Sequence, residues 1–354
     1  MPQAFDDKPS HSEAASHIDG GPDDNETDLL RIHPTITLDE GARDRLTQLV
    51  RCCDHTLKSV TRWGQQAHWL QPGPHSPRDL DQHAVTRKLG PGSTWTRDPL
   101  DRAVHTSILY LAAAAQHLAG IRSLLETGQV IFPVAPLVRA VVELCGRVHW
   151  TFAANTELHV RQRVARMVLL ELDDADRARV LANDLQLRHL AKAHAQEHAR
   201  LTRDRLDAMF YPSEKQTKNN RLTLCGQKLP SLTASVKTLQ TPGLYAGLSA
   251  ASHPTLQLVL ELIDKTRLGS QPGTAAADPT ASVPLSFRLP DMDYLAILVR
   301  NAALVLVQAW TMLATYSGNS VDLLDPLQDE IVAMTSRAPL SDDESETQQH
   351  PDRS

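Results

Sequence analysis

The chain has 354 residues, of which 41% are hydrophobic and 22% are charged, so it is long enough to bury a substantial core. A formal net charge of −6 argues against a broadly basic surface of the kind that coats DNA. The sequence has no Gly-x-Ser-x-Gly elbow, Walker loop or dinucleotide fingerprint, so the enzyme classes built on those motifs have no support and no cofactor is expected.

Both ends of the chain are expected to be disordered tails. Residues 1–34 are rich in Asp, Ser, His and Pro, and residues 337–354 are acidic, so neither segment can bury enough apolar surface to fold alone. No basic start with an apolar run marks a signal peptide, and polar residues interrupt the later apolar runs before membrane-spanning length. We therefore expect a cytoplasmic protein without a membrane partner, whose helical domain spans residues 35–336.

The four cysteines contain no CxxC pair. The neighbouring pair within one helix is poorly placed to form a disulfide with itself. The sequence therefore predicts reduced thiols at Cys52, Cys53, Cys145 and Cys225.

The first helix signal is Thr37-Leu-Asp-Glu40, because a threonine and a glutamate at this spacing can cap each other's backbone donors. An amphipathic run follows to about residue 70. Its expected buried face consists of Leu46, Leu49, Cys53, Leu57 and Val60.

Residues 71–99 hold five prolines and several glycines without a sustained period, which predicts a flexible insertion. At its end, Asp98 precedes Pro99, and this order is typical of an N-cap followed by the first helical residue. An Ala- and Leu-rich helix is expected to follow and to end near Gly128.

Most of the remaining chain also has the periodicity of helices. Two exceptions are residues 211–229, a polar stretch that predicts an exposed loop, and residues 269–285, a second flexible insertion. No alternation of strands and helices and no fixed-period repeat occurs, so we predict an all-α fold, a multi-helix bundle or array with long flexible insertions. The further helices are expected over 136–155, 156–185, 187–209, 232–239, 291–316 and 321–334.

A ladder of charged residues crosses one apolar helix. Arg139, Glu143 and Arg147 are four residues apart and so lie along one side of the helix. The ladder is either a solvated face or, because apolar residues flank it, an enclosed site where Glu143 holds a guanidinium toward a cavity. The planar fork of arginine suits a carboxylate or phosphate.

A second helix segment, LYAGLSAASHPTL, carries Tyr245, Ser249 and His253 at the same spacing. Pro254 disfavours the helical conformation at His253, which places the imidazole at a break or at the cap of a new helix. The three side chains form either a structural hydrogen-bond network or part of a polar site with one group that titrates near neutral pH.

Arg300 and Asn301 are a third polar intrusion, within the apolar run YLAILVRNAALVLVQAW. If the three helices meet, their polar groups form a mostly apolar pocket with a few cationic donors, which is typical of a site for a small anion. The leading prediction is a non-catalytic or regulatory protein that binds a small anionic ligand or a protein partner. Its expected binding residues are Arg139, Glu143, Tyr245, Ser249, His253 and Arg300.

Another segment, His194-Ala-Gln-Glu197-His198, matches the His-x-x-Glu-His spacing of inverted zinc metallopeptidases. That chemistry needs a large mixed sheet and a distant acidic ligand, and the surrounding sequence predicts neither. A metal-dependent hydrolase is therefore the least favoured alternative, and no metal ligand is assigned.

The same helix contains Arg188-His189-x-x-x-x-His194, which resembles the Arg-x(4 to 6)-His motif of HEPN domains. The resemblance implies a helical bundle, commonly a homodimer, that cleaves RNA without a metal. Arg188 would stabilise charge on the scissile phosphate and His194 would transfer a proton. A metal-independent ribonuclease of a defence or toxin system is thus the main alternative function.

A looser resemblance spans residues 101–316. An Arg-x-x-x-Glu helix at Arg139 to Glu143 precedes a Tyr-x-x-Leu-Ser-x-x-x-His segment at Tyr245 to His253. This pairing resembles uncharacterised bacterial helical proteins, some of them abortive-infection-like. The resemblance implies the helical fold more than a catalytic activity.

Overall fold

The computed structural model describes residues 38–69, 71–88, 98–128, 133–152, 158–218, 221–231 and 292–336, together with the single residues 234, 239 and 248. Within these ranges the chain forms eight α-helices and one small sheet, which confirms the all-α fold. The helices are α1 (Glu40–Gln66), α2 (Pro77–Lys88), α3 (Asp98–Thr127), α4 (Val134–Phe152), α5 (Val160–Asp184), α6 (Arg188–Leu201), α11 (Met292–Ser317) and α12 (Asp325–Thr335).

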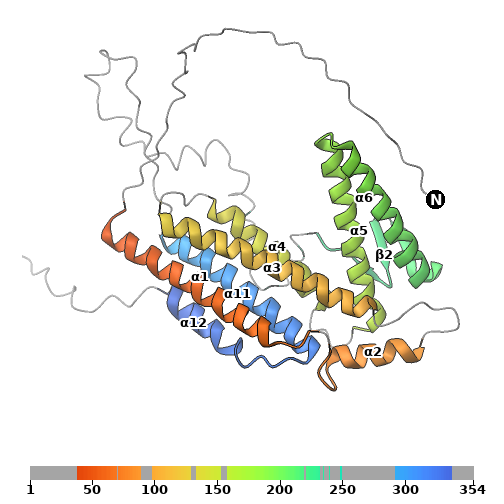
Figure 1. The fold of residues 1–354 in the computed structure, drawn as a ribbon, viewed down its shortest axis with the longest axis horizontal. Helices are drawn as coiled ribbons and strands as arrows, with labels where there is room; N and C mark the ends of the chain where they lie inside the picture. Colours follow the sequence, from red (N-terminus) through yellow and green to blue (C-terminus); the bar gives the residue numbers. More distant parts are fainter. Residues whose placement is uncertain are drawn as a thin grey trace, which may run out of the picture.

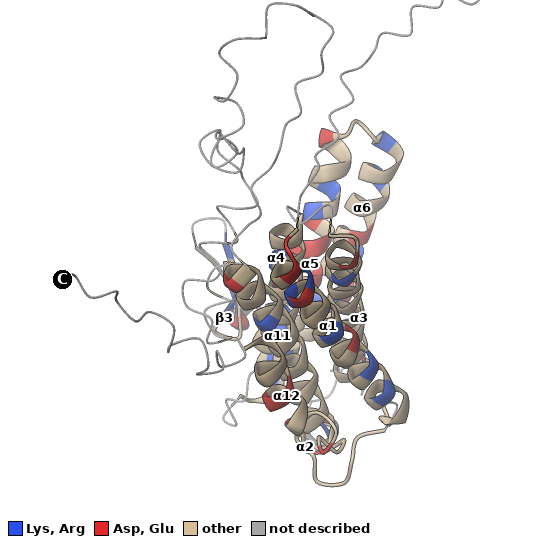
Figure 2. Ribbon diagram, turned by 90° about the vertical axis from the view of Figure 1, so that its left-hand side faces the viewer, with Lys and Arg blue, Asp and Glu red and all other residues tan. Residues whose placement is uncertain are grey.

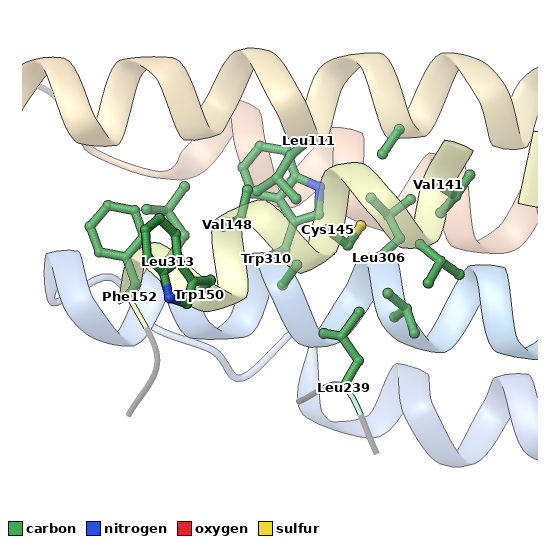
Figure 3. Packing of buried hydrophobic residues seen from close by; sticks show 14 of the residues in the cluster. Leu111, Val141, Cys145, Val148, Trp150, Phe152, Leu239, Leu306, Trp310 and Leu313 are labelled. Carbon is green, nitrogen blue, oxygen red and sulfur yellow. The ribbon is translucent and has the colours of Figure 1, made fainter. Parts of the chain in front are cut away.

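Five helices, α1, α3, α4, α11 and α12, lie side by side and form the main body of the protein, here called the bundle (Figure 1). Their apolar faces enclose a core in which Leu111, Val141, Cys145 and Leu306 are completely buried (Figure 3). Helices α4 and α11 run alongside each other through this core because both are apolar around most of their circumference.

Helix α1 follows its predicted pattern except at its ends, since it stops at Gln66 rather than near residue 70. The N-cap is Asp39 rather than Thr37, and its carboxylate accepts a hydrogen bond from the Ala42 amide at 2.7 Å. Thr37 itself lies outside the described residues. Leu46, Leu49, Cys53 and Val60 are buried as predicted, and Leu57 is partly buried against the same core.

Residues 71–88 differ from the prediction of a flexible insertion, because they contain α2 and pack against the bundle. The contact begins where the Gly73 amide donates to the Ser317 carbonyl at 2.8 Å. A Cβ at Gly73 would lie 2.5 Å from the Gly318 carbonyl oxygen, so only glycine allows the two backbones to approach this closely.

Helices α5 and α6 form an antiparallel hairpin, here called the arm, which projects from the bundle (Figure 1). Its turn is a Schellman motif, in which the Leu187 amide donates to Ala182 at 2.8 Å and the Gln186 amide to Asn183 at 2.9 Å. Gln186 has φ 58°, the left-handed conformation that this motif requires. A π-helical segment, η1 (Thr202–Asp207), extends α6.

The prediction of an exposed loop over residues 211–229 is wrong. This stretch forms a three-stranded antiparallel sheet of β1 (Lys215–Lys218), β2 (Arg221–Leu224) and β3 (Gln227–Lys228). The turn between β2 and β3 has positive φ at both Cys225 (49°) and Gly226 (73°), as a type I′ hairpin requires. Leu224 is fully buried, and β2 and β3 pack against α5.

The other boundaries lie close to those predicted. Helix α3 ends at Thr127 before Gly128, whose φ is 62°, and α11 covers the predicted apolar helix. Helix α12 starts at Asp325, four residues after the predicted start at residue 321. The second insertion, 269–285, lies outside the described residues, as does most of the predicted helix 232–239.

Two described helices are long and apolar enough to cross a membrane by length and composition alone. They are residues Pro99–Thr127 of α3 and the whole of α11. The most apolar window of α11 is 61% buried inside the protein, whereas that of α3 is 28% buried. The core helix of a soluble protein is also long, apolar and mostly buried. Length and composition alone are therefore weak evidence that either helix crosses a membrane.

All four cysteines are free thiols. Cys52, Cys53 and Cys145 are buried and Cys225 is half-buried, as expected for cysteines that pack in or beside a core. Burial raises the pKa of Cys52 to about 11 and that of Cys53 and Cys145 still higher, so these thiols pack as apolar side chains.

Candidate functional site

The predicted ion pair on α4 is present. Arg139 Nε donates to Glu143 Oε1 at 2.8 Å, and the two side chains are 21% and 23% exposed. They are therefore neither enclosed nor on a fully solvated face. The i, i+4 spacing brings them together on one side of the helix, as the sequence pattern requires.

Arg147, the third member of the ladder, turns away to a different partner. Its guanidinium forms an ion pair with Asp174 of α5, and the Tyr110 hydroxyl of α3 donates to the same carboxylate. The Arg147 guanidinium also lies 5.4 Å from the centre of the Tyr110 ring. Burial and the Asp174 charge raise the pKa of Tyr110, so this hydroxyl stays protonated and joins the arm to the bundle.

The other predicted binding residues are not brought together within the described part of the chain. Arg300 is half-buried on α11, next to α4, and its guanidinium forms no hydrogen bond or ion pair with a described residue. Asn301 uses its amide to donate to the Ile297 carbonyl of its own helix at 2.7 Å. Tyr245, Ser249 and His253 lie outside the described residues. Convergence of the six groups therefore stays a prediction.

The two residues of the HEPN-like motif both lie on α6. Arg188 is exposed at the first residue of the helix, and His194 is half-buried. Six residues at 3.6 per turn separate them by about 120° around the helix axis, so they point in different directions. Neither residue contacts a partner among the described residues, and ribonuclease activity through this pair stays a prediction.

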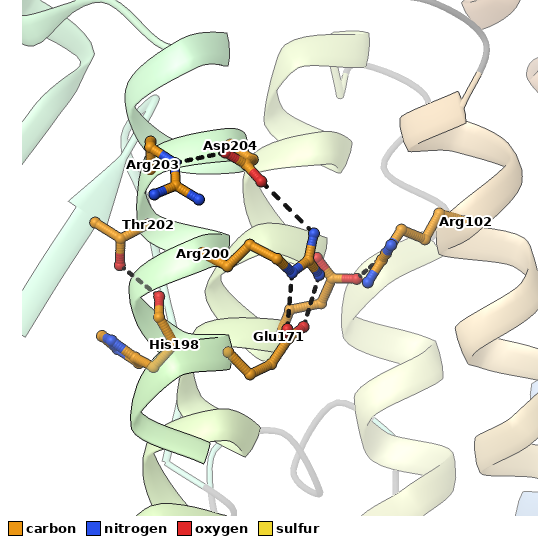
Figure 4. A network of polar contacts seen from close by, with 8 residues as sticks. Arg102, Glu171, His198, Arg200, Thr202, Arg203 and Asp204 are labelled. Atoms are coloured by element: carbon orange, nitrogen blue, oxygen red, sulfur yellow. Dashed lines mark hydrogen bonds and ion pairs between the residues drawn. The ribbon is translucent and has the colours of Figure 1, made fainter. Parts of the chain in front are cut away.

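In the His-x-x-Glu-His segment, the glutamate is paired with an arginine. Both oxygens of Glu197 accept hydrogen bonds from Arg200 at 2.7 Å, and Arg200 also lies 3.7 Å from Asp204 (Figure 4). The hydrogen bonds from Arg200 lower the pKa of Glu197, so its carboxylate stays ionised. Across the described ranges no group of three His, Cys, Asp or Glu side chains is placed to hold a metal.

A different site emerges between the arm and the sheet, here called the hollow. It has a volume of about 720 Å³ and is bounded by α5 on one side, by the end of α6 with η1 on another, and by β1, β2 and the residues after β3. Five of the lining side chains are apolar and are here together called its floor: Leu169, Leu172, Leu206, Leu222 and Leu229.

Charged side chains surround this apolar floor. The two carboxylates in the lining are already engaged, Asp173 by Arg177 at 2.6 Å and Asp176 by Arg179 at 2.7 Å. Arg221 at the start of β2 and Lys228 at the end of β3 are exposed.

The side chains of Arg221 and Lys228 form no ion pair or hydrogen bond with a described residue. Since the lining carboxylates are compensated by their own arginines, the two free charges give the hollow a cationic rim. His198 of α6 also lines it, and its ring contacts no described hydrogen-bond partner.

Two arginines of α5 fix the sheet beside the hollow. Arg161 holds Glu214 through two hydrogen bonds of 2.8 and 2.5 Å, the bidentate geometry that orients a carboxylate most strictly. Arg166 donates to Gln227 at 2.8 Å and to the Trp150 carbonyl at 2.6 Å. The end of the sheet that carries Lys228 is therefore tied to a rigid helix, and Arg221 lies at the opposite end of β2.

Sequence reasoning missed this site because it treated residues 211–229 as a loop. The signal that could have found it is short: Leu222 and Leu224 alternate with polar residues, and Cys225-Gly226 follows as a hairpin turn. Two-residue turns between alternating segments predict a hairpin, and a hairpin places Lys228 opposite Thr223, two residues along β2 from Arg221.

In comparisons with known proteins, no family model, no curated protein and no solved structure matches this chain. The resemblance to HEPN and abortive-infection-like proteins thus rests on the sequence motifs alone.

Proposed function

We propose that the protein binds a small amphiphilic anion, a carboxylate or phosphate attached to an apolar body, in the hollow between α5, η1 and the sheet. The observation that carries the proposal is the cationic rim of Arg221 and Lys228 above a leucine-lined floor. A ligand with one anionic end and one apolar end would meet complementary groups at both.

The dimensions and chemistry of the hollow support this class of ligand. A volume of about 720 Å³ lies within the range of small-molecule sites, which typically combine apolar walls with a few placed polar groups. Arginine presents a planar fork to a carboxylate or phosphate, and lysine adds a mobile point charge. His198 can contribute a further hydrogen bond from the α6 side.

The proposal keeps the ligand class that the sequence suggested and moves it to other residues. Arg139 and Glu143 satisfy each other at 2.8 Å, so that guanidinium is already committed to a carboxylate. Arg221 and Lys228 have no such commitment among the described residues, and binding an anion there would not require an existing ion pair to break.

Octanoate is a suitable probe because it has one carboxylate and a short apolar chain. We expect it to bind with a measurable heat in titration calorimetry, whereas octylamine, with the same chain and the opposite charge, does not bind. Replacing both cations in Arg221→Gln/Lys228→Gln should weaken octanoate binding by at least about tenfold, since each charge-assisted hydrogen bond contributes roughly 1.5–3 kcal/mol.

The matched control is Arg203→Gln, which removes an arginine that is 74% exposed on η1 and outside the lining. This variant should bind octanoate as the unmodified chain does. Equal binding of octanoate and octylamine, or unchanged binding in the double variant, would show that the rim does not select an anion and would refute the proposal.

A further inference from the structure

The tip of the arm carries more exposed large hydrophobic residues than any other short segment that the structure describes. Among the described residues, twelve large hydrophobic side chains are exposed, and five of them fall within residues 180–190. Leu181 and Leu185 are each 59% exposed, and they lie one helical turn apart on the same side of α5. The other three are Val180, Leu187 and Leu190, with exposed fractions of 44%, 38% and 40%.

The tip is a defined shape rather than a loose end. The Schellman turn fixes the path from α5 to α6, and the Leu187 amide is bonded back to Ala182 at 2.8 Å. Figure 1 shows the turn at the far end of the arm from the bundle, so no helix of the bundle covers it. Several exposed apolar side chains gathered on a rigid projection are typical of a protein interface.

The charges around the patch decide what kind of partner fits it. Asp184 on α5 and Arg188 and Lys192 on α6 are all exposed, and none has a partner among the described residues. Figure 2 shows both signs of charge at the end of the hairpin. A nucleic acid or an anionic membrane would leave Asp184 facing like charge, whereas a second copy of the same tip can pair each sign with its opposite.

We propose that two copies of this chain associate through their arm tips in an isologous contact. The leucines of one tip pack against those of the other, and Asp184 of each copy faces the basic side chains of its partner across a twofold axis. The interface is independent of the hollow, because none of its five apolar residues lines that site.

The expected dimer is weak, because five side chains cover less than the roughly 800 Å² per partner of a standard stable interface. Sedimentation velocity from about 1 μM to about 100 μM should therefore show the mass rising from 39.0 kDa toward twice that value. A chain that stays monomeric throughout this range overturns the proposal, and so does a monomeric chain that co-sediments with phosphatidylserine vesicles.

Leu181→Gln/Leu185→Gln tests whether the tip is the interface. Both positions are exposed, so the variant should keep its helical circular dichroism and its octanoate binding while it remains monomeric. The control Leu109→Gln/Leu323→Gln removes two leucines that are 56% and 45% exposed elsewhere and should dimerise as the unmodified chain does. Dimerisation of the tip variant, or its loss in the control, assigns the contact to another surface.

The charge arrangement gives a sharper test. Asp184→Lys leaves only positive charge at the tip and should weaken the dimer by about tenfold, whereas Asp184→Lys/Arg188→Asp restores both signs and should recover it. A loss that the second substitution fails to recover contradicts the isologous pairing.

A cysteine at the tip provides a second measurement that does not depend on affinity. With oxidised glutathione as the oxidant, Leu185→Cys should form a covalent dimer through disulfide exchange, whereas Leu109→Cys should not. Monomer alone from Leu185→Cys under conditions where the unmodified chain dimerises would place the contact away from the tip.

Discussion

The bundle and the arm use the same amino acid in opposite ways. Leu49, Leu111 and Leu306 are completely buried in the bundle, whereas Leu181 and Leu185 at the end of the arm are each 59% exposed. Both regions are regular helices, so secondary structure does not distinguish them. The difference arises because five helices surround one core in the bundle, while the arm has a single layer of two helices whose outer half packs against no other described element.

Ion pairs show the same contrast. At the base of the arm, Arg163 of α5 lies 2.9 Å from Asp81 of α2, and the two side chains are only 8% and 13% exposed. Further out, the Arg200 and Glu197 side chains are 40% and 43% exposed. The comparison suggests that stability resides in the bundle and its joint with the arm, and that the rest of the arm supplies surfaces for binding.

The largest expected effect is at the buried joint. Arg163→Met removes the cation beside Asp81, whose pKa burial already raises, and should lower the free energy of unfolding by about 3–5 kcal/mol. Arg200→Met on the arm should cost less than about 1 kcal/mol. Urea denaturation measures both free energies of unfolding. Adding Asp81→Asn to Arg163→Met should recover part of the lost stability. Similar losses at the two arginines would contradict the contrast between the buried joint and the arm.

Shortening a leucine to alanine should also distinguish the bundle from the arm. The expected difference in the free energy of unfolding is similar to that between the two arginine variants. Leu306→Ala leaves a cavity in the bundle core and should cost about 2–5 kcal/mol. Leu185→Ala, at a position that is 59% exposed, should change stability by less than about 0.5 kcal/mol at concentrations where the chain is monomeric. The midpoint of urea unfolding gives both values, and an equal loss at the two positions would mean that the arm tip is packed.

His149 in the bundle should make the stability of the folded protein depend on pH. Burial lowers the pKa of His149 on α4 below its ordinary value of 6.5, and its Nδ1 has no hydrogen-bond partner. The unfolded chain therefore takes up this proton more readily than the folded one, so the associated stability is present above pH 6.5 and is lost as the pH falls. Unfolding in urea at about pH 7.5 and about pH 5.5 should show a smaller loss in His149→Gln than in the unmodified chain. An identical loss of stability in His149→Gln and the unmodified chain would show that other groups cause the pH dependence.

The smallest expected effect is at the turn of the arm. Gln186 adopts φ 58°, which glycine tolerates without a steric cost, so Gln186→Gly should stabilise the protein by up to about 1 kcal/mol. Gln186→Val should act in the opposite direction, because a β-branched residue resists this conformation. Thermal unfolding followed by circular dichroism measures both changes. A shift of the same sign in both variants would show that the turn relaxes to another conformation.

The sequence predicted the helices well because their signals are local. The apolar period of α1, α3, α4 and α11 repeats within each segment, and Gly128 marks the end of α3 in the sequence itself. The pairing of Arg139 with Glu143 was also readable, since four residues in a helix always bring two side chains to one side.

The features that the sequence did not predict depend on contacts between segments that are far apart in the chain. Residues 77–88 have weak periodicity, and α2 is held where Gly73 and Gly318 meet and where Asp81 contacts Arg163. Arg147 belongs to the same sequence ladder as Arg139, yet its partner is Asp174, which lies on another helix. No spacing along one helix could have identified that carboxylate.

By itself, then, the sequence determined which segments are helical and which side of each is apolar, because a helix repeats every 3.6 residues whatever surrounds it. Only the tertiary structure turned the polar stretch Lys215–Lys218 into a strand and left Arg221 and Lys228 at the rim of a hollow. The physical reason is that short polar strands gain little from their own sequence and form where a neighbour, here α5 with Arg161 and Arg166, supplies the apolar surface and the hydrogen bonds that hold them.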